Sequence, residues 1–160
     1  MKEVKLETML TVYESFEELP EDAIFLINEA AEARKRAYAP YSKFLVGAAI
    51  LLENGKIITG NNQENASYPT GLCAERTAIF YARSKYPGVT IKMMALTAGA
   101  GEGESEVPIP PCGSCRQAIS EYETSQNEPI ELFFMGVKGK IVKSKSIANL
   151  LPLAFERSML

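Results

Sequence analysis

The sequence contains no histidine and no tryptophan among its 160 residues. The absence of histidine excludes Ser-His and Cys-His nucleophilic sites, metal sites built on imidazole, and proton transfer by a histidine side chain. Any catalysis by this chain must therefore use carboxylates, thiolates or a metal ion. Cysteine is scarce, with three residues, an odd number that is too small for a secreted disulfide framework and is compatible with reduced thiols.

Long apolar runs and an excess of positive charge are also missing. No apolar run approaches the roughly 20 residues that span a bilayer, and residues 1–5 carry charges where a signal peptide has an apolar core. The net charge is −3, and the acidic stretch 102–106 would repel a phosphate backbone. We therefore expect a cytoplasmic protein with no membrane segment and no nucleic-acid partner.

Length and composition are ordinary for one soluble globular unit, with 46% apolar and 23% charged residues. Residues 1–20 alternate weakly between apolar and polar side chains, which predicts an extended N-terminal arm of uncertain attachment. Residues 21–160 are predicted to form a single domain.

Apolar periodicity and turn residues divide that domain into helices and strands. Their order calls for one mixed, roughly five-stranded sheet with helices on both faces, which is a three-layer α/β/α sandwich. Strands joined through a helix should be parallel, and the two hairpins must be antiparallel. The predicted helices cover residues 21–39, 72–85, 113–123 and 146–150, and the predicted strands cover 44–52, 56–61, 91–97, 130–135 and 140–143.

The three cysteines lie where loops run into predicted helices. Cys73 stands two residues before Glu75, and Cys112 and Cys115 form a C-x-x-C pair after a proline. A helix N-terminus carries partial positive charge, which lowers thiol pKa values and favours the thiolate that binds metal. Three thiolates around Zn²⁺ leave one tetrahedral position for water, as in catalytic zinc sites. We predict a zinc ion held by Cys73, Cys112 and Cys115.

Two charged residues beside Cys73 are expected to serve this metal. Glu75 can reach a metal-bound water without being a ligand, and burial beside an anionic site would raise its pKa and suit it to general acid/base work. Zinc with three thiolates has a formal charge of −1, which makes its water a weak acid unless positive charge offsets it. Arg76 is therefore expected to donate hydrogen bonds to a ligand sulfur.

Other interpretations of the same residues stay open. The C-x-x-C pair alone is compatible with a redox dithiol, and three cysteines are often simply buried. A zinc-stabilised binding protein without turnover is a further alternative, with Glu75 as a fourth ligand that blocks the open position. Metal content separates a redox dithiol, which holds no stoichiometric metal, from a catalytic zinc site and from a zinc-stabilised binding protein.

The joint pattern of C-x-E, followed about 36 residues further on by Pro-Cys-x-x-Cys, is similar to that of the zinc deaminases, with cysteine in place of their histidine. The chain resembles the cytidine deaminases, specifically their short, homotetrameric, three-cysteine kind. The resemblance covers about residues 21–155. Besides the cysteine motifs, the segments that carry it are 41–49, 62–68 and 150–155.

The resemblance implies hydrolysis of cytidine or deoxycytidine to the uridine and ammonia, by a zinc-bound hydroxide and with Glu75 as proton shuttle. It implies that Phe44 packs on the pyrimidine ring, that Asn62 and Glu64 bind ribose hydroxyls, and that the backbone around Ala74 holds the base carbonyl. Blasticidin S deaminases share the metal motifs, so another cytosine compound is an alternative substrate.

The resemblance further implies a homotetramer with sites shared between subunits. Ala66, Tyr68 and Phe155 would reach into the pocket of a neighbouring copy. Residues 98–110 depart from the family pattern, so the resemblance does not predict the rim of the pocket. Residues 1–20 lie outside the resemblance.

Overall fold

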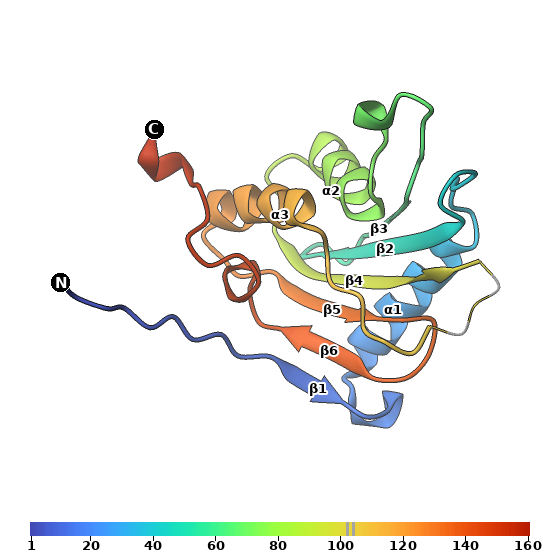
Figure 1. The fold of residues 1–160 in the computed structure, drawn as a ribbon, viewed down its shortest axis with the longest axis horizontal. Coiled ribbons are helices and arrows are strands. Elements are labelled where there is room, and N and C mark those ends of the chain that lie inside the picture. Colours follow the sequence, from blue (N-terminus) through green and yellow to red (C-terminus); the bar gives the residue numbers. More distant parts are fainter. Residues whose placement is uncertain (102, 104) are drawn as a thin grey trace.

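A mixed sheet organises the fold, with helices on both of its faces (Figure 1). The computed structural model describes residues 1–160 except 102 and 104, two glutamates of the acidic stretch, which lie outside the described residues. Helix α1 covers one face, and α2 and α3 cover the other. The three-layer α/β/α prediction is therefore confirmed. The elements are β1 (Thr11–Tyr13), α1 (Glu21–Arg34), β2 (Phe44–Leu52), β3 (Ile57–Asn61), α2 (Ala74–Lys85), β4 (Ile91–Ala100), α3 (Gly113–Gln126), β5 (Glu131–Met135) and β6 (Ile141–Ser144).

The order of the strands across the sheet is β1-β6-β5-β4-β2-β3. Strands β4 and β5, which α3 connects, are parallel, and the hairpins β2-β3 and β5-β6 are antiparallel, as predicted. Strand β2 also pairs antiparallel with β4, so β3 and β4 run in the same direction on either side of it. In the described part of the chain the sheet has six strands where about five were predicted.

The additional strand comes from the predicted N-terminal arm. Strand β1 pairs antiparallel with β6, placing Val12 opposite Val142. Three residues are too few for a periodic pattern to identify, which is why the sequence did not reveal this strand. Leu19 is buried, and Tyr13 and Phe16 pack against the cluster under α1. Residues 1–10 carry no helix or strand, although the Thr8 hydroxyl donates to the Asn149 carbonyl (2.6 Å).

Two predicted boundaries moved for local reasons. Helix α1 ends at Arg34 and not before Pro40, because Arg36 and Ala37 donate to carbonyls three residues earlier and close a tight turn. The last predicted helix is a short 3-10 turn, Ile147–Asn149, capped by the Ser146 hydroxyl. In the described residues, no helix is long and apolar enough to cross a membrane.

Two apolar layers hold the helices on the sheet. One lies between α1 and the sheet and includes Leu26 and Phe133, and the other lies under α2 and α3 and includes Ile79 and Ile119. Strand β2 is apolar throughout because both faces are covered. Gly60 on β3 lets α2 approach closely, since a Cβ there would lie 2.7 Å from the Ala74 carbonyl oxygen. This contact seats the first turn of α2, which carries the cysteine motif.

The division of the chain into an N-terminal arm, residues 1–20, and a domain, residues 21–160, stays a prediction. The contacts of the arm predict how its removal changes stability. A chain that lacks residues 2–10 loses no helix or strand and only the exposed hydrogen bond of Thr8, so its free energy of unfolding in urea should fall by at most about 1 kcal/mol. A chain that lacks residues 2–19 also loses β1 and the buried Leu19, so its unfolding free energy should fall by about 2 kcal/mol or more. Equal stability of the two truncated chains would contradict the packing described above.

Candidate metal centre and its pocket

Helices α2 and α3 bring the three cysteines together. Cys73 is the N-cap of α2, Cys112 is the N-cap of α3, and Cys115 lies fully buried in the first turn of α3. Their sulfur atoms all lie within 4.8 Å of one another, and Cys73 Sγ is 3.9 Å from Cys112 Sγ. Sulfurs on a tetrahedron with zinc bonds of about 2.3 Å stand roughly 3.8 Å apart. The spacing and the donor type therefore fit zinc.

The proton distribution in the cluster favours metal binding. A hydrogen bond from the Cys115 thiol, helped by Arg76, lowers the pKa of Cys73 to about 5. The same hydrogen bond, together with burial, raises the pKa of Cys115. The lowered pKa of Cys73 favours its thiolate, the form that binds metal, and a divalent cation would favour the thiolate form of the sulfurs that bind it.

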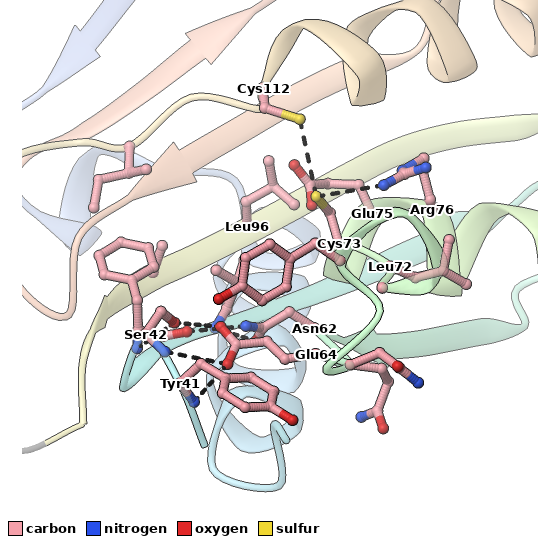
Figure 2. A pocket seen from close by; sticks show the side chains of 18 of the residues that line it. Tyr41, Ser42, Asn62, Glu64, Leu72, Cys73, Glu75, Arg76, Leu96 and Cys112 are labelled. Carbon is pink, nitrogen blue, oxygen red and sulfur yellow. Dashed lines mark hydrogen bonds between the residues drawn. The ribbon is translucent and has the colours of Figure 1, made fainter. Parts of the chain in front are cut away.

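Arg76 supplies positive charge to the sulfurs. Its Nη2 donates to Cys73 Sγ at 3.9 Å, and this hydrogen bond raises the pKa of the guanidinium. Its Nε is buried and has no hydrogen-bond partner among the described residues. The side chain thus points to the ligands and not to bulk solvent (Figure 2). Its role beside a bound metal stays a prediction.

Glu75 lies beside the cluster without belonging to it. Its side chain is 5% exposed, and burial raises the pKa of its carboxyl. In the described part of the chain, the group that can hold a metal consists of the three cysteines alone. Glu75 also lines the pocket that opens over Cys73 and Cys112 (Figure 2), so its carboxyl can exchange protons with a molecule bound there.

The pocket has a volume of about 750 Å³, which is suitable for a small organic molecule. Its walls come from the loop before β2, from β2 itself, from the segment between β3 and α2, and from β4. Phe44 lies on one wall, and its contact with a pyrimidine ring stays a prediction. Sequence analysis missed several lining residues. Leu96 and Ala98 lie on β4, which is buried on both faces, so no alternation marks the side of the pocket. Tyr41 and Ser42 fall in the segment 41–49 that carries the resemblance but were given no role, and no sequence pattern points to Ile109 or Pro110.

Asn62 and Glu64 also line the pocket, and both are already hydrogen bonded. The Asn62 amide accepts from Val46 N (2.8 Å) and donates to the Phe44 carbonyl (2.9 Å). The Asn62 side chain therefore hydrogen bonds to the backbone of β2 as a neighbouring strand would. Glu64 accepts from Tyr41 N (2.9 Å), from Ser42 N (3.2 Å) and from the Ser42 hydroxyl. The Ser42 hydrogen bond lowers the pKa of the Glu64 carboxyl.

The remaining predicted residues lie in three different places. Ala74 is fully buried at the start of α2, between the ligand Cys73 and Glu75. Tyr68 is 78% exposed and lines this chain's own pocket, where its ring meets Tyr41 edge to face at 6.3 Å. Ala66 is exposed and Phe155 is 60% exposed, and neither lines this pocket. The Phe155 carbonyl accepts from Gln117 on α3 (2.8 Å).

The geometry of the cluster predicts the effect of removing one ligand. Cys112→Ser should lower zinc content from one ion per chain to well below that after dialysis against a chelator, because a hydroxyl is a poor ligand for zinc. The melting temperature should fall as well, since zinc binding contributes to folding. Ser114→Ala, which changes an exposed neighbour of the ligands, is the matched control. Full zinc retention by the Cys112 variant would contradict the three-sulfur site.

Comparisons with known proteins agree with this centre. Residues 20–127, which contain all three cysteines, match the family described as "Cytidine and deoxycytidylate deaminase zinc-binding region". A cytidine deaminase from Sporosarcina psychrophila is 44% identical over 133 residues, which are 82% of this chain and 90% of the relative. One from Halalkalibacterium halodurans is 40% identical over 136 residues, covering 84% and 94%.

Solved structures give the same result for the fold. The crystal structure of cytidine deaminase from Burkholderia pseudomallei matches with a TM-score of 0.72 and 40% identity, covering 86% of this chain and all of that one. The cytidine deaminase structure from Mycobacterium tuberculosis matches with a TM-score of 0.65 and 34% identity, covering 85% and 98%. With its three sulfurs spaced for zinc, the chain belongs to the cytidine and deoxycytidylate deaminase zinc-binding family.

Proposed function

We propose that the protein hydrolyses cytidine, deoxycytidine or both to the corresponding uridine and ammonia. The observation that carries the proposal is a buried carboxyl, Glu75, that lies between a three-sulfur metal centre and a pocket large enough for a nucleoside. Relatives of 40–44% identity that are named cytidine deaminases support the substrate.

The residues of the pocket have distinct tasks in this reaction. Cys73, Cys112 and Cys115 would hold a zinc ion, which would supply an activated water for attack on C4 of the pyrimidine. Glu75 would take one proton from that water and deliver it to N3 of the ring. It would then take the remaining proton from the hydroxyl on C4 and pass it to the exocyclic amine, which leaves as ammonia while the C4 carbonyl forms. Burial raises the pKa of Glu75, which helps its carboxyl to take up a proton. Arg76 offsets the negative charge of the sulfurs.

The substrate is oriented by the walls of the pocket. We assign the ring face to Phe44, the ribose hydroxyls to Asn62 and Glu64, and the base carbonyl to the backbone around Ala74. The deprotonated Glu64 carboxylate is purely an acceptor, so it selects a donor such as a sugar hydroxyl.

We infer that the active assembly is a homotetramer in the cytoplasm. Phe155 and Ala66 are exposed away from their own pocket, which suits residues that complete the pocket of a neighbouring subunit. Tyr68, on the rim of its own pocket, is sufficiently exposed to contact a neighbour as well. The three free cysteines are compatible with a reducing compartment.

Glu75→Gln tests the proton shuttle. Zinc content should stay at one ion per chain, while kcat on cytidine should fall by about 100-fold or more, because the amide cannot carry a proton. Glu121→Gln, an exposed glutamate on α3, is the matched control and should keep full activity. Ammonia release from cytidine, deoxycytidine and blasticidin S, measured side by side, identifies the substrate. Substantial turnover by the Glu75 variant would overturn its assignment.

Mixed assemblies test the sharing of sites. Phe155→Ala and Glu75→Gln subunits should each be weakly active alone. In mixed tetramers, some sites combine an intact Glu75 with an intact Phe155 from the neighbour, so activity should exceed the sum of the parents. Activity equal to that sum would show that Phe155 does not complete a neighbouring site, and sedimentation of the mixtures confirms that tetramers have formed.

A further inference from the structure

One hydroxyl, that of Ser42, joins the two sides of the pocket. It donates to Glu64 Oε1 on the sugar side and accepts from the backbone N–H of Phe44 (3.0 Å) on the base side. Figure 2 shows Ser42 beside Glu64, with dashed lines that mark the hydrogen bonds between these two residues. Because a hydroxyl has a single proton, the Phe44 N–H occupies an acceptor position of Oγ and leaves that proton for Glu64.

The backbone beside Ser42 binds the other carboxylate oxygen. Glu64 Oε2 accepts from Tyr41 N (2.9 Å) and Ser42 N (3.2 Å). A glutamate at the rim of a pocket otherwise samples several rotamers and loses entropy when a ligand fixes one of them. Here donors at both oxygens hold the carboxylate in place while leaving further acceptor positions free.

The turn that carries Ser42 has an unusual backbone conformation. Lys43 has φ of +57°, in the left-handed region that residues with a side chain rarely adopt. Two backbone hydrogen bonds maintain this conformation, from Lys43 N to the Ala39 carbonyl (3.1 Å) and from Gly101 N to the Lys43 carbonyl (3.0 Å). Through this turn the Ser42 side chain and the Phe44 N–H face each other.

We propose that Ser42 is a positioning residue that holds the Glu64 carboxylate ready to accept a sugar hydroxyl of the substrate. The proposal rests on the proposed deamination of nucleosides and adds a specific dependence on the sugar. Loss of the Ser42 hydroxyl should weaken binding of a nucleoside with a 3′-hydroxyl, and it should not affect a nucleoside that offers Glu64 no such donor. A purely structural serine would affect both alike.

The test compares three substrates on Ser42→Ala: cytidine, deoxycytidine and 2′,3′-dideoxycytidine. For the first two, KM should rise about tenfold while kcat changes much less, since a hydrogen bond to a charged group is lost. For dideoxycytidine, KM, or its inhibition constant against cytidine, should stay within about twofold of the unchanged protein. Ser42→Thr, which keeps the hydroxyl at an exposed position, should restore most of the affinity.

Two controls separate this role from damage to the fold. Ser125→Ala removes a hydroxyl whose hydrogen bond is to Tyr122 on the same helix, and it should leave all three substrates unaffected. In a Glu64→Ala background, Ser42→Ala should add no further increase in KM for cytidine. Zinc content and melting temperature of each variant are measured alongside.

Each contrary result has its own meaning. An unchanged KM for cytidine in Ser42→Ala, or an equal rise for dideoxycytidine, would overturn the role of Ser42 and leave the deaminase proposal intact. If the unchanged, zinc-loaded protein released ammonia from no cytosine nucleoside, the proposed function would fail, and the sugar-side role of Ser42 with it.

Discussion

The convergence of three sulfur atoms at the N-termini of two helices is the constraint on which the rest of the structure depends. Cys73 begins α2, while Cys112 and Cys115 begin α3, so the cluster exists only if both helices lie side by side on the same face of the sheet. The close approach of Gly60 to the first turn of α2 and the buried Ile79 and Ile119 provide that arrangement. The packing of α2 and α3 on the sheet is thus also what brings the three metal-binding sulfurs together.

The electrostatics of the cluster explain why a cation belongs there. Three thiolates in contact repel one another: the hydrogen bond to Cys73 and burial raise the pKa of Cys115, whereas the same hydrogen bond and Arg76 lower the pKa of Cys73. Arg76 and two helix N-termini offset part of the remaining negative charge. Burial beside the sulfurs also raises the pKa of Glu75, because a site shielded from water disfavours negative charge.

The sequence predicted the metal site well because the necessary information is local. Without histidine, and with all three cysteines at predicted helix starts, a zinc site of Cys73, Cys112 and Cys115 was the favoured interpretation among the alternatives that the sequence left open. The apolar run of β2 and the hairpin turn after it are local in the same way. Strand β1 was not predicted, because its pairing with β6 joins residues far apart in the chain and only three residues take part.

The sugar side of the pocket was predicted only through resemblance to a family. Nothing in the order of residues shows that the Asn62 amide pairs with β2, or that Ser42 reaches Glu64. Both depend on the left-handed turn at Lys43 and on the path of the chain after β3, which tertiary contacts decide. Phe155 and Tyr68 were expected in a neighbour's pocket. A single chain places Tyr68 at its own pocket and leaves Phe155 outside it.

The central claim is that three thiolates hold one zinc ion and leave one position open. X-ray absorption at the zinc edge of the purified protein tests this claim most directly. The three-cysteine centre predicts one zinc per chain, with three sulfur neighbours at about 2.3 Å and one oxygen neighbour at about 2.0 Å. Absence of stoichiometric zinc, or a shell with fewer than three sulfurs, would contradict it.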